Sequence, residues 1–266
     1  MPAWTLYGLM RGVATTKWEG GEGDTGQVGV QGMPRYNPEK CDSGCNECVV
    51  ACLPGALSLK EGSEVRLNLD YGRCIACQLC VETCPTGALT GSNDWAFGVA
   101  NRDDLLWKDA MGSADARTLK RRVEQVFKGS LHIRHVDAGS CNGCESELQA
   151  LNNPFYNLHR LGIFFTPSPR FADVLLVTGT VTYAMRQPLK ATYEAMPDPK
   201  MVLALGTCAI SGGIAAGGYS SGHGLDGVLP VDVWLPGCPP NPAAIIQALL
   251  MLIDRAPQKV QGGRLE

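Results

Sequence analysis

The sequence has no apolar run of the roughly 18–20 residues that a membrane-spanning helix needs. Its most apolar stretch, residues 243–253, is shorter and contains Gln247, which favours a buried amphipathic helix. The first residues, MPAWTLYGLMRG, lack the charged and then apolar pattern of a secretory signal, and they contain no twin-arginine pair. We therefore expect the protein to stay on the cytoplasmic side of the membrane.

The sequence also lacks a strong charge of either sign. Its 23 lysines and arginines and 26 aspartates and glutamates leave a net charge of −3. Nucleic-acid binding is disfavoured, because counterion release needs a dense basic surface. No GxxxxGK[ST] loop occurs, and no GxGxxG segment follows a predicted strand, so nucleotide binding has no support. No Ser–His–Asp set is recognisable. We expect the histidines, which have no metal-ligand spacing, to be structural: His132, His135, His159 and His223.

What the sequence does have is cysteine, twelve residues in three groups of four. In a reducing cytosol, dense cysteine indicates metal or redox chemistry rather than disulfides. Residues 41–52 read CDSGCNECVVAC, and residues 74–85 read CIACQLCVETCP. Because twelve thiolates divide evenly into three four-iron clusters, the sequence predicts a conduit for single electrons. The third group consists of Cys141, Cys144, Cys208 and Cys238.

The run at 74–85 matches the CxxCxxCxxxCP pattern of bacterial two-cluster ferredoxins, in which the fourth cysteine ligates the other cluster. Residues 48–58 (CVVACLPGALS) and 80–90 (CVETCPTGALT) form an internal repeat, as expected of two similar halves. The pattern predicts two [4Fe–4S] clusters. The first would be held by Cys41, Cys45, Cys48 and Cys84, and the second by Cys52, Cys74, Cys77 and Cys80.

The first run departs from this pattern in two places. Three residues instead of two separate Cys41 from Cys45, and Leu53 stands between Cys52 and Pro54. The extra residue can change exposure and the hydrogen bonds to sulfur that tune reduction potential. Two structural zinc sites are the alternative, since CxxC pairs also suit zinc. A zinc ribbon needs two CxxC pairs rather than two tight runs of four cysteines, so we favour clusters.

From residue 130 onward, short apolar runs alternate with helical segments, which predicts a parallel sheet covered on both faces. The third group of cysteines follows the expected strands, at the carboxyl ends where open α/β sheets form ligand sites. Four unrelated buried thiols are the alternative. The expected strands are 131–136, 174–178, 201–205 and 231–235, and the expected helices are 143–152, 181–196 and 241–254.

Three segments of this region resemble one known family: DAGSCNGCESEL at 137–148, GTCAISGG at 206–213 and PGCPPNP at 236–242. They resemble the small subunit of energy-converting [NiFe] hydrogenases, which is related to the 20-kDa subunit of respiratory complex I. Residues 1–95, with GLMRGVATTKWE and PRYNPEKC, resemble the eight-iron ferredoxin-like subunit of formate hydrogenlyase and complex I. The chain is thus similar to a fusion of two subunits. The complex I subunit has two adjacent cysteines at the first ligand position. This chain has CNGC at 141–144 instead, a spacing that is typical of hydrogenases.

The resemblance implies an electron-transfer subunit of a membrane-associated [NiFe] hydrogenase of the formate hydrogenlyase type, with three [4Fe–4S] clusters. It implies a large subunit that carries nickel and iron, integral membrane subunits, and an upstream donor such as formate dehydrogenase, carbon monoxide dehydrogenase or ferredoxin. The chain would lie on the cytoplasmic face of the inner membrane. The alternatives are a complex I-like quinone- or ferredoxin-linked oxidoreductase without nickel, and a zinc-stabilised scaffold.

The resemblance also implies a proton-transferring acid near the third cluster, for which Glu147 is placed ahead of Glu145. Stabilisation of a helix N-terminus is an adequate alternative for both glutamates.

Together these patterns predict a flavodoxin-like α/β domain preceded by a small α+β ferredoxin domain of the bacterial two-cluster type. Residues 64–69 (EVRLNL) alternate as a short strand does. The first segment could dock on a partner or a membrane surface, or pack on the protein itself. The expected layout is an extended arm over 1–31, the ferredoxin-like domain over 32–95, a helical linker over 96–129 and the α/β domain over 130–266.

Overall fold

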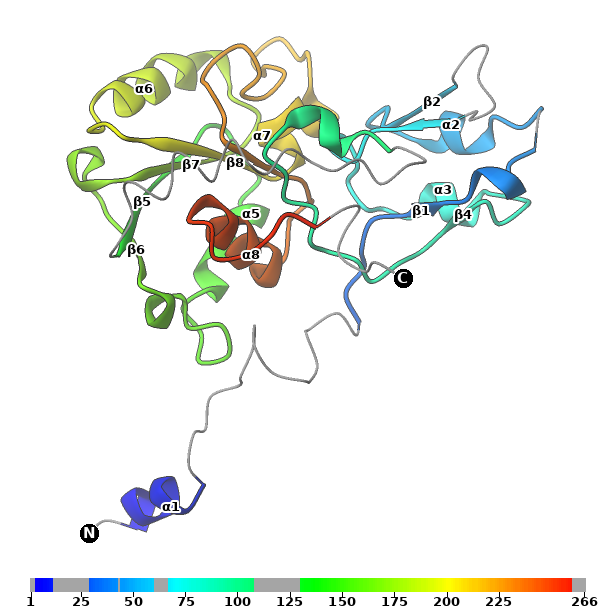
Figure 1. Ribbon diagram of the computed structural model, residues 1–266. Helices are drawn as coiled ribbons and strands as arrows, with labels where there is room; N and C mark the ends of the chain where they lie inside the picture. Colours follow the sequence, from blue (N-terminus) through cyan, green and yellow to red (C-terminus); the bar gives the residue numbers. More distant parts are fainter. Residues whose placement is uncertain (1–2, 12–28, 43, 60–66, 108–129, 260–266) are drawn as a thin grey trace.

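Two short helix–strand units form the cysteine-dense part of the chain, seen in a computed structural model (Figure 1). The structure describes residues 3–11, 29–42, 44–59, 67–107 and 130–259. The internal repeat folds as α2 followed by β2 and α3 followed by β4, and the two helices lie against each other. The elements of this module are β1 (Arg35–Tyr36), α2 (Glu47–Ala51), β2 (Leu57–Leu59), β3 (Leu67–Leu69), α3 (Leu79–Glu82) and β4 (Leu89–Thr90).

The four strands of this module pair into two antiparallel ribbons. Strand β1 pairs with β4, and β2 pairs with β3, with Ser58 opposite Asn68. The strand expected at 64–69 is confirmed where the structure describes it, over β3. Its partner β2 and the short β1 and β4 were not predicted. The module therefore has the α+β character expected of a two-cluster ferredoxin.

A five-stranded parallel sheet forms the second part of the chain, in the order β6-β5-β7-β8-β9. Counted within this domain, the order is 2-1-3-4-5, which is that of flavodoxin-like folds and confirms the expected fold class. The strands are β5 (Leu131–Asp137), β6 (Ile163–Phe165), β7 (Val174–Thr178), β8 (Met201–Leu205) and β9 (Val233–Leu235). The helices are α5 (Gly143–Ala150), α6 (Tyr183–Glu194), α7 (Thr207–Ser211) and α8 (Pro242–Leu252).

Alternate side chains of the central strands enter two separate apolar clusters. Leu176 and Leu203 lie in the cluster that includes α5 and α8. On the other face, Leu175 and Val177 lie in a cluster that includes Leu189 of α6. That second cluster continues without interruption into the ferredoxin-like module, through residues such as Leu57, Leu69 and Leu89. The module and the sheet therefore share one core.

Residues 96–107 are the described part of the predicted linker, and they contain no α-helix. Trp95, Phe97 and Val99 alternate with small residues, which is the period of a strand. Phe97 and Val99 are buried, and the Phe97 ring lies 4.7 Å from that of Tyr71 in the ferredoxin-like module. A 3₁₀ turn over Arg102–Leu105 follows. This segment joins the two parts of the chain, and the helix expected near 117–128 lies outside the described residues.

The first segment was expected to be an extended arm, and this is wrong for residues 3–11. Helix α1 spans Ala3–Arg11 instead of extended chain, in keeping with the helix-forming residues Ala, Leu, Met and Arg there. Its side chains Leu6, Tyr7 and Leu9 are exposed. The expected extended segment that follows α1 lies mostly outside the described residues.

Helix α8 is buried on all sides rather than amphipathic. Asn241 caps it through a 2.8 Å bond from Ala244 N to Oδ1, with proline at the first helical position. The sheet and α5 cover one side, and Gly98 packs on Ala248 from the other. Inside the protein, Gln247 Nε2 donates a 3.0 Å hydrogen bond to the Pro257 carbonyl. Within the described ranges, no helix is long and apolar enough to cross a membrane.

Candidate iron–sulfur centres

The first predicted set of cysteines gathers around Cys48, which lies buried in α2. Burial, with a further contribution from the neighbouring thiolates of Cys41, Cys45 and Cys84, raises the pKa of Cys48 to about 11. Cys84 comes from the other half of the repeat, so the structure brings together the crossed set that the ferredoxin pattern predicted. Tyr36 also lies beside Cys41 and Cys48. Burial is the main cause that raises the pKa of its phenol, and the contact with Cys41 is the next.

The second predicted set gathers around Cys80 in α3. Burial is the largest cause that raises the pKa of Cys80 to about 12, and the nearby thiolates of Cys74, Cys52 and Cys77 contribute to the same shift. Burial likewise raises the pKa of Cys74 to about 12. The cysteines of this set therefore crowd one another, and an apposed cationic metal core would relieve that repulsion.

Backbone amides point at sulfur atoms in both sets. Ala56 N lies 3.2 Å from Cys52 Sγ, and Ala76 N lies 3.4 Å from Cys74 Sγ. Burial raises the pKa of Cys84, but hydrogen bonds from the chain that follows it, including Thr86, outweigh burial and leave that pKa below its usual value. Such bonds favour the thiolate, which is the form that ligates iron.

The third predicted set lies at the carboxyl edge of the parallel sheet. Cys141 follows β5, Cys208 lies in α7 directly after β8, and Cys238 follows β9. Asn142 adopts the left-handed conformation (φ 68°) that asparagine tolerates, and α5 begins directly after it. Burial raises the pKa of Cys144, with further contributions from Glu145 and from the other three cysteines of the set. The structure thus brings together four cysteines that are spread over about a hundred positions.

Two glycines leave room for a bulky group beside this set. Gly206 has φ +88°, and a Cβ atom on it would lie 2.7 Å from Cys144 Sγ. Gly213 has φ +57°, and a Cβ atom there would lie 3.0 Å from Cys208 Sγ. Any larger residue would crowd the sulfur atoms, so the backbone is shaped for close approach of an inorganic group.

The three sets fit iron–sulfur clusters by the chemistry of their donors, since every member is a thiol. Across the described ranges, no three or more His, Cys, Asp or Glu side chains converge to hold a metal ion directly.

The two glutamates after the CxxC pair differ in their surroundings. Glu145 Oε1 accepts a hydrogen bond from Thr178 Oγ1 and lies 3.6 Å from His135 Nε2. Burial lowers the pKa of His135, although Glu145 opposes that shift. Glu147 is half-buried, and burial raises the pKa of its carboxyl. Glu145 is therefore part of a packed polar network, whereas Glu147 holds its proton more readily than an exposed glutamate.

Three of the four histidines have structural partners, as expected. His132 Nδ1 lies 3.4 Å from Asp173 Oδ2, and His135 Nε2 lies 2.9 Å from Thr178 Oγ1. The His159 ring stacks on Phe164 at 5.2 Å.

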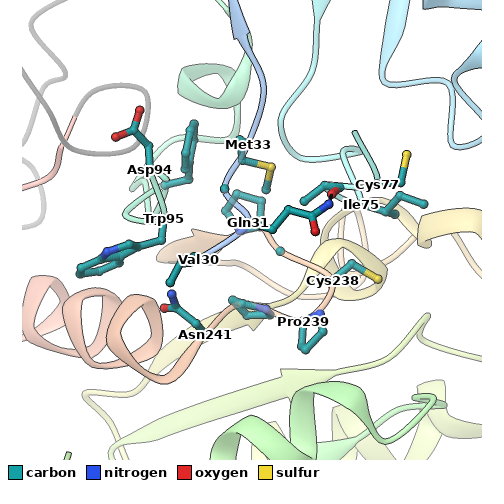
Figure 2. A pocket seen from close by; sticks show the side chains of 16 residues that line it. Val30, Gln31, Met33, Ile75, Cys77, Asp94, Trp95, Cys238, Pro239 and Asn241 are labelled. Atoms are coloured by element: carbon teal, nitrogen blue, oxygen red, sulfur yellow. Dashed lines mark hydrogen bonds between the residues drawn. The ribbon is translucent and has the colours of Figure 1, made fainter. Parts of the chain in front are cut away.

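Sequence reasoning missed the contacts that bring the second and third sets close to each other. Cys77 of the second set and Cys238 of the third both line one cavity (Figure 2), which has a volume of about 350 Å³. Gln31 Nε2 binds the Ala76 carbonyl at 2.7 Å and fixes the loop that carries Cys77. Thr207 Oγ1 lies 2.9 Å from the Cys74 carbonyl. No motif marks these residues, because each contact joins segments far apart in the sequence.

Two models of known protein families match separate parts of the chain. The family model described as NADH ubiquinone oxidoreductase, 20 Kd subunit, matches residues 141–252. A 4Fe-4S dicluster domain model matches residues 40–88.

Two relatives have hydrogenase-related names. Formate hydrogenlyase subunit 7 of Escherichia coli (strain K12) is 43% identical over 143 residues, 54% of this chain and 56% of that protein. The chain thus spans little more than half the length of this relative. The probable membrane-bound hydrogenase subunit mbhJ of Pyrococcus furiosus is 38% identical over 153 residues, 56% of this chain and 92% of that protein.

Among solved structures, a chain of the membrane-bound sulfane sulfur reductase, an archaeal respiratory membrane complex, is 38% identical. The match covers 53% of this chain and 75% of that chain, with a TM-score of 0.43.

The resemblance inferred from the cysteine motifs is confirmed by the two family models and by the high coverage of the Pyrococcus relative. The chain belongs to the family of the 20-kDa subunit of NADH ubiquinone oxidoreductase, and a 4Fe-4S dicluster domain precedes the family's segment in it.

Proposed function

We propose that this chain is the iron–sulfur electron-transfer subunit of a membrane-bound [NiFe] hydrogenase complex of the formate hydrogenlyase type. The observation that carries the proposal is the gathering of twelve cysteines into three sets of four, with the third set at the carboxyl edge of the sheet. The names of the relatives in Escherichia coli and Pyrococcus furiosus support the same conclusion.

Each set would hold one [4Fe–4S] cluster. When bound, such clusters accept and release single electrons. The thiolates would hold the iron, and the amides of Ala56 and Ala76 would stabilise negative charge on sulfur. The proposed ligands are Cys41, Cys45, Cys48 and Cys84 for the first cluster, Cys52, Cys74, Cys77 and Cys80 for the second, and Cys141, Cys144, Cys208 and Cys238 for the third.

The proposed layout keeps a ferredoxin-like domain over 32–95 and an α/β domain over 130–266, with residues 96–107 as the joint between them. Electrons would enter at the ferredoxin-like domain and leave through the third set toward a partner subunit that carries nickel and iron. Formate dehydrogenase, carbon monoxide dehydrogenase or ferredoxin would supply the electrons. Integral membrane subunits would hold the chain at the cytoplasmic face of the inner membrane.

Glu147 is the proposed proton-relaying acid. Its raised pKa favours a carboxyl that can hold and release a proton nearer neutral pH. Glu145 is engaged with Thr178 and His135, which suits a role in positioning α5 rather than in proton transfer.

A second candidate keeps the fold but changes the enzyme. The matching family model is named for a subunit of NADH ubiquinone oxidoreductase, which favours a complex I-like oxidoreductase, quinone- or ferredoxin-linked, that has no nickel centre. The CNGC spacing at 141–144 favours the hydrogenase instead.

Purification of the intact complex that contains this chain separates the two candidates. We expect nickel in the complex and evolution of hydrogen when a low-potential reductant is supplied. A complex with iron–sulfur signals, no nickel and no hydrogen evolution would overturn the hydrogenase and leave the second candidate. A colourless preparation that contains zinc and gives no paramagnetic signal after dithionite reduction would contradict both.

A further inference from the structure

The hydroxyl of Thr207 connects the second cysteine set to the third. Its Oγ1 lies 2.9 Å from the carbonyl oxygen of Cys74, although 133 positions separate the two residues. Thr207 is the first residue of α7 and directly precedes Cys208. Its side chain is buried, with 1% of the residue exposed. One side chain thus touches a residue of the second set while its backbone continues into the third.

The same hydroxyl also contacts the loop that carries Cys238. Thr207 N donates to the Gly237 carbonyl at 2.9 Å, and Gly237 N lies 3.4 Å from Thr207 Oγ1. A threonine hydroxyl donates one hydrogen bond and can accept others. The hydroxyl has one proton, and the shorter of its two acceptor distances, 2.9 Å to the Cys74 carbonyl against 3.2 Å to the Gly237 carbonyl, favours donation to Cys74. With Gly237 N donating to Oγ1, a chain of hydrogen bonds then runs from the Cys238 loop to Cys74.

The contact at Thr207 differs from the other place where the second and third sets approach each other. The second and third sets also approach each other at Cys77 and Cys238, but there they border a cavity of about 350 Å³ (Figure 2). At Thr207, by contrast, a buried hydroxyl lies within hydrogen-bond distance of the Cys74 carbonyl and of the Gly237 carbonyl, which belongs to the residue before Cys238. Buried polar atoms in such positions are satisfied with few exceptions, so replacement of this hydroxyl leaves the Cys74 carbonyl without its partner.

We infer that Thr207 is a positioning residue for electron transfer between the second and third clusters, an inference that rests on the proposed function. One electron would pass from the group that Cys52, Cys74, Cys77 and Cys80 would hold to the group that Cys141, Cys144, Cys208 and Cys238 would hold. The first group is oxidised by one electron, and the second is reduced by one. The hydroxyl keeps its proton and forms no covalent bond. The Thr207 hydroxyl holds the backbones of Cys74 and Gly237 in place relative to each other by hydrogen bonding to both.

Three substitutions separate this role from a merely structural one. Thr207→Val keeps the shape of the side chain and removes the hydroxyl, whereas Thr207→Ser keeps the hydroxyl. Ser211→Ala is the matched control, because Ser211 Oγ lies in the same helix and donates only to the Thr207 carbonyl at 3.1 Å.

The test uses the purified complex, reduced by a light flash and frozen at successive times for electron paramagnetic resonance. We expect the signal of the third cluster to rise several-fold more slowly in T207V than in wild type, at unchanged iron content and reduction potentials. T207S and S211A keep the wild-type rate.

A wild-type rate in T207V, or equal slowing in T207S, overturns the inference while the proposed function stands. Loss of iron from T207V overturns it too, because the hydroxyl would then serve assembly. If electrons do not pass between the two clusters in the wild type, the proposed function fails together with the inference.

Discussion

Val99 and Trp234 pair in both directions across the joint of the molecule. Val99 N lies 3.0 Å from the Trp234 carbonyl, and Trp234 N lies 2.8 Å from the Val99 carbonyl. Trp234 belongs to β9, the edge strand of the sheet, so the segment after the ferredoxin-like module covers that edge. Together with the shared apolar cluster, this bridge ties the two modules into one structure.

The shared core predicts that both modules unfold together. On heating, the loss of visible iron–sulfur absorbance and the loss of far-ultraviolet circular dichroism should coincide in one transition, because neither module keeps a complete core without the other. Two separated transitions would show that the modules are stable independently.

The crossed pairing of the two cysteine runs predicts which substitutions act on the same cluster. Cys84→Ser should perturb the same paramagnetic signal as Cys45→Ser, and Cys52→Ser should perturb the signal that Cys77→Ser affects, because Cys84 neighbours Cys48 while Cys52 neighbours Cys80. The measurement is electron paramagnetic resonance of the four reduced variants. If C84S and C77S change the same signal, each run binds its own cluster and the crossed pairing is wrong.

Gly206 should tolerate no side chain. Gly206→Ala places a methyl group 2.7 Å from Cys144 Sγ at a positive φ of +88°, whereas Gly227→Ala also has a positive φ (+67°) but no atom within 4 Å of the methyl group. We expect G227A to lower the free energy of unfolding by about 1–2 kcal/mol. G206A should cost more and should reduce the occupancy of the third cluster. Thermal unfolding and iron analysis measure both, and equal effects of the two variants would contradict a crowded third set.

Glu147 should matter for proton delivery and not for electron transfer. Glu147→Gln cannot exchange a proton, so hydrogen evolution should fall by about 10²-fold, the usual lower contribution of a general acid or base. Its iron–sulfur signals and their rates of reduction should stay as in wild type. Glu145→Gln is the comparison, since it perturbs the contacts with Thr178 and His135 and should act on stability instead. Unchanged hydrogen evolution in E147Q would remove the proposed proton role.

Sequence reasoning succeeded where one local pattern decides the outcome. The apolar runs of β7 and β8 match the expected strands residue for residue, because strands buried on both faces need continuous apolar sequence. The first two cysteine sets were predicted from the spacing within each run and the third from its place after the expected strands, and the structure brings the members of each set together.

The misses have one physical origin, which is that tertiary contacts override local signals. Strand β6 has three residues, too few to show any period, and it forms by pairing with β5. Residues 96–107 were predicted only as part of a linker, and it is pairing with Trp234 and packing on Tyr71 that fix their conformation. Thr207 carries no motif at all, and only the fold brings it to Cys74.

Iron and sulfide analysis, combined with spin counting after full reduction, tests the central claim most directly when wild type is compared with Cys238→Ser. Three four-iron clusters predict about 12 iron atoms in the wild-type chain and about 8 in C238S. In C238S the two ferredoxin-type signals should persist, the third should be lost, and hydrogen evolution should cease. A wild-type chain with iron for only two clusters, or a C238S variant that keeps its full iron and its hydrogen evolution, would contradict the account.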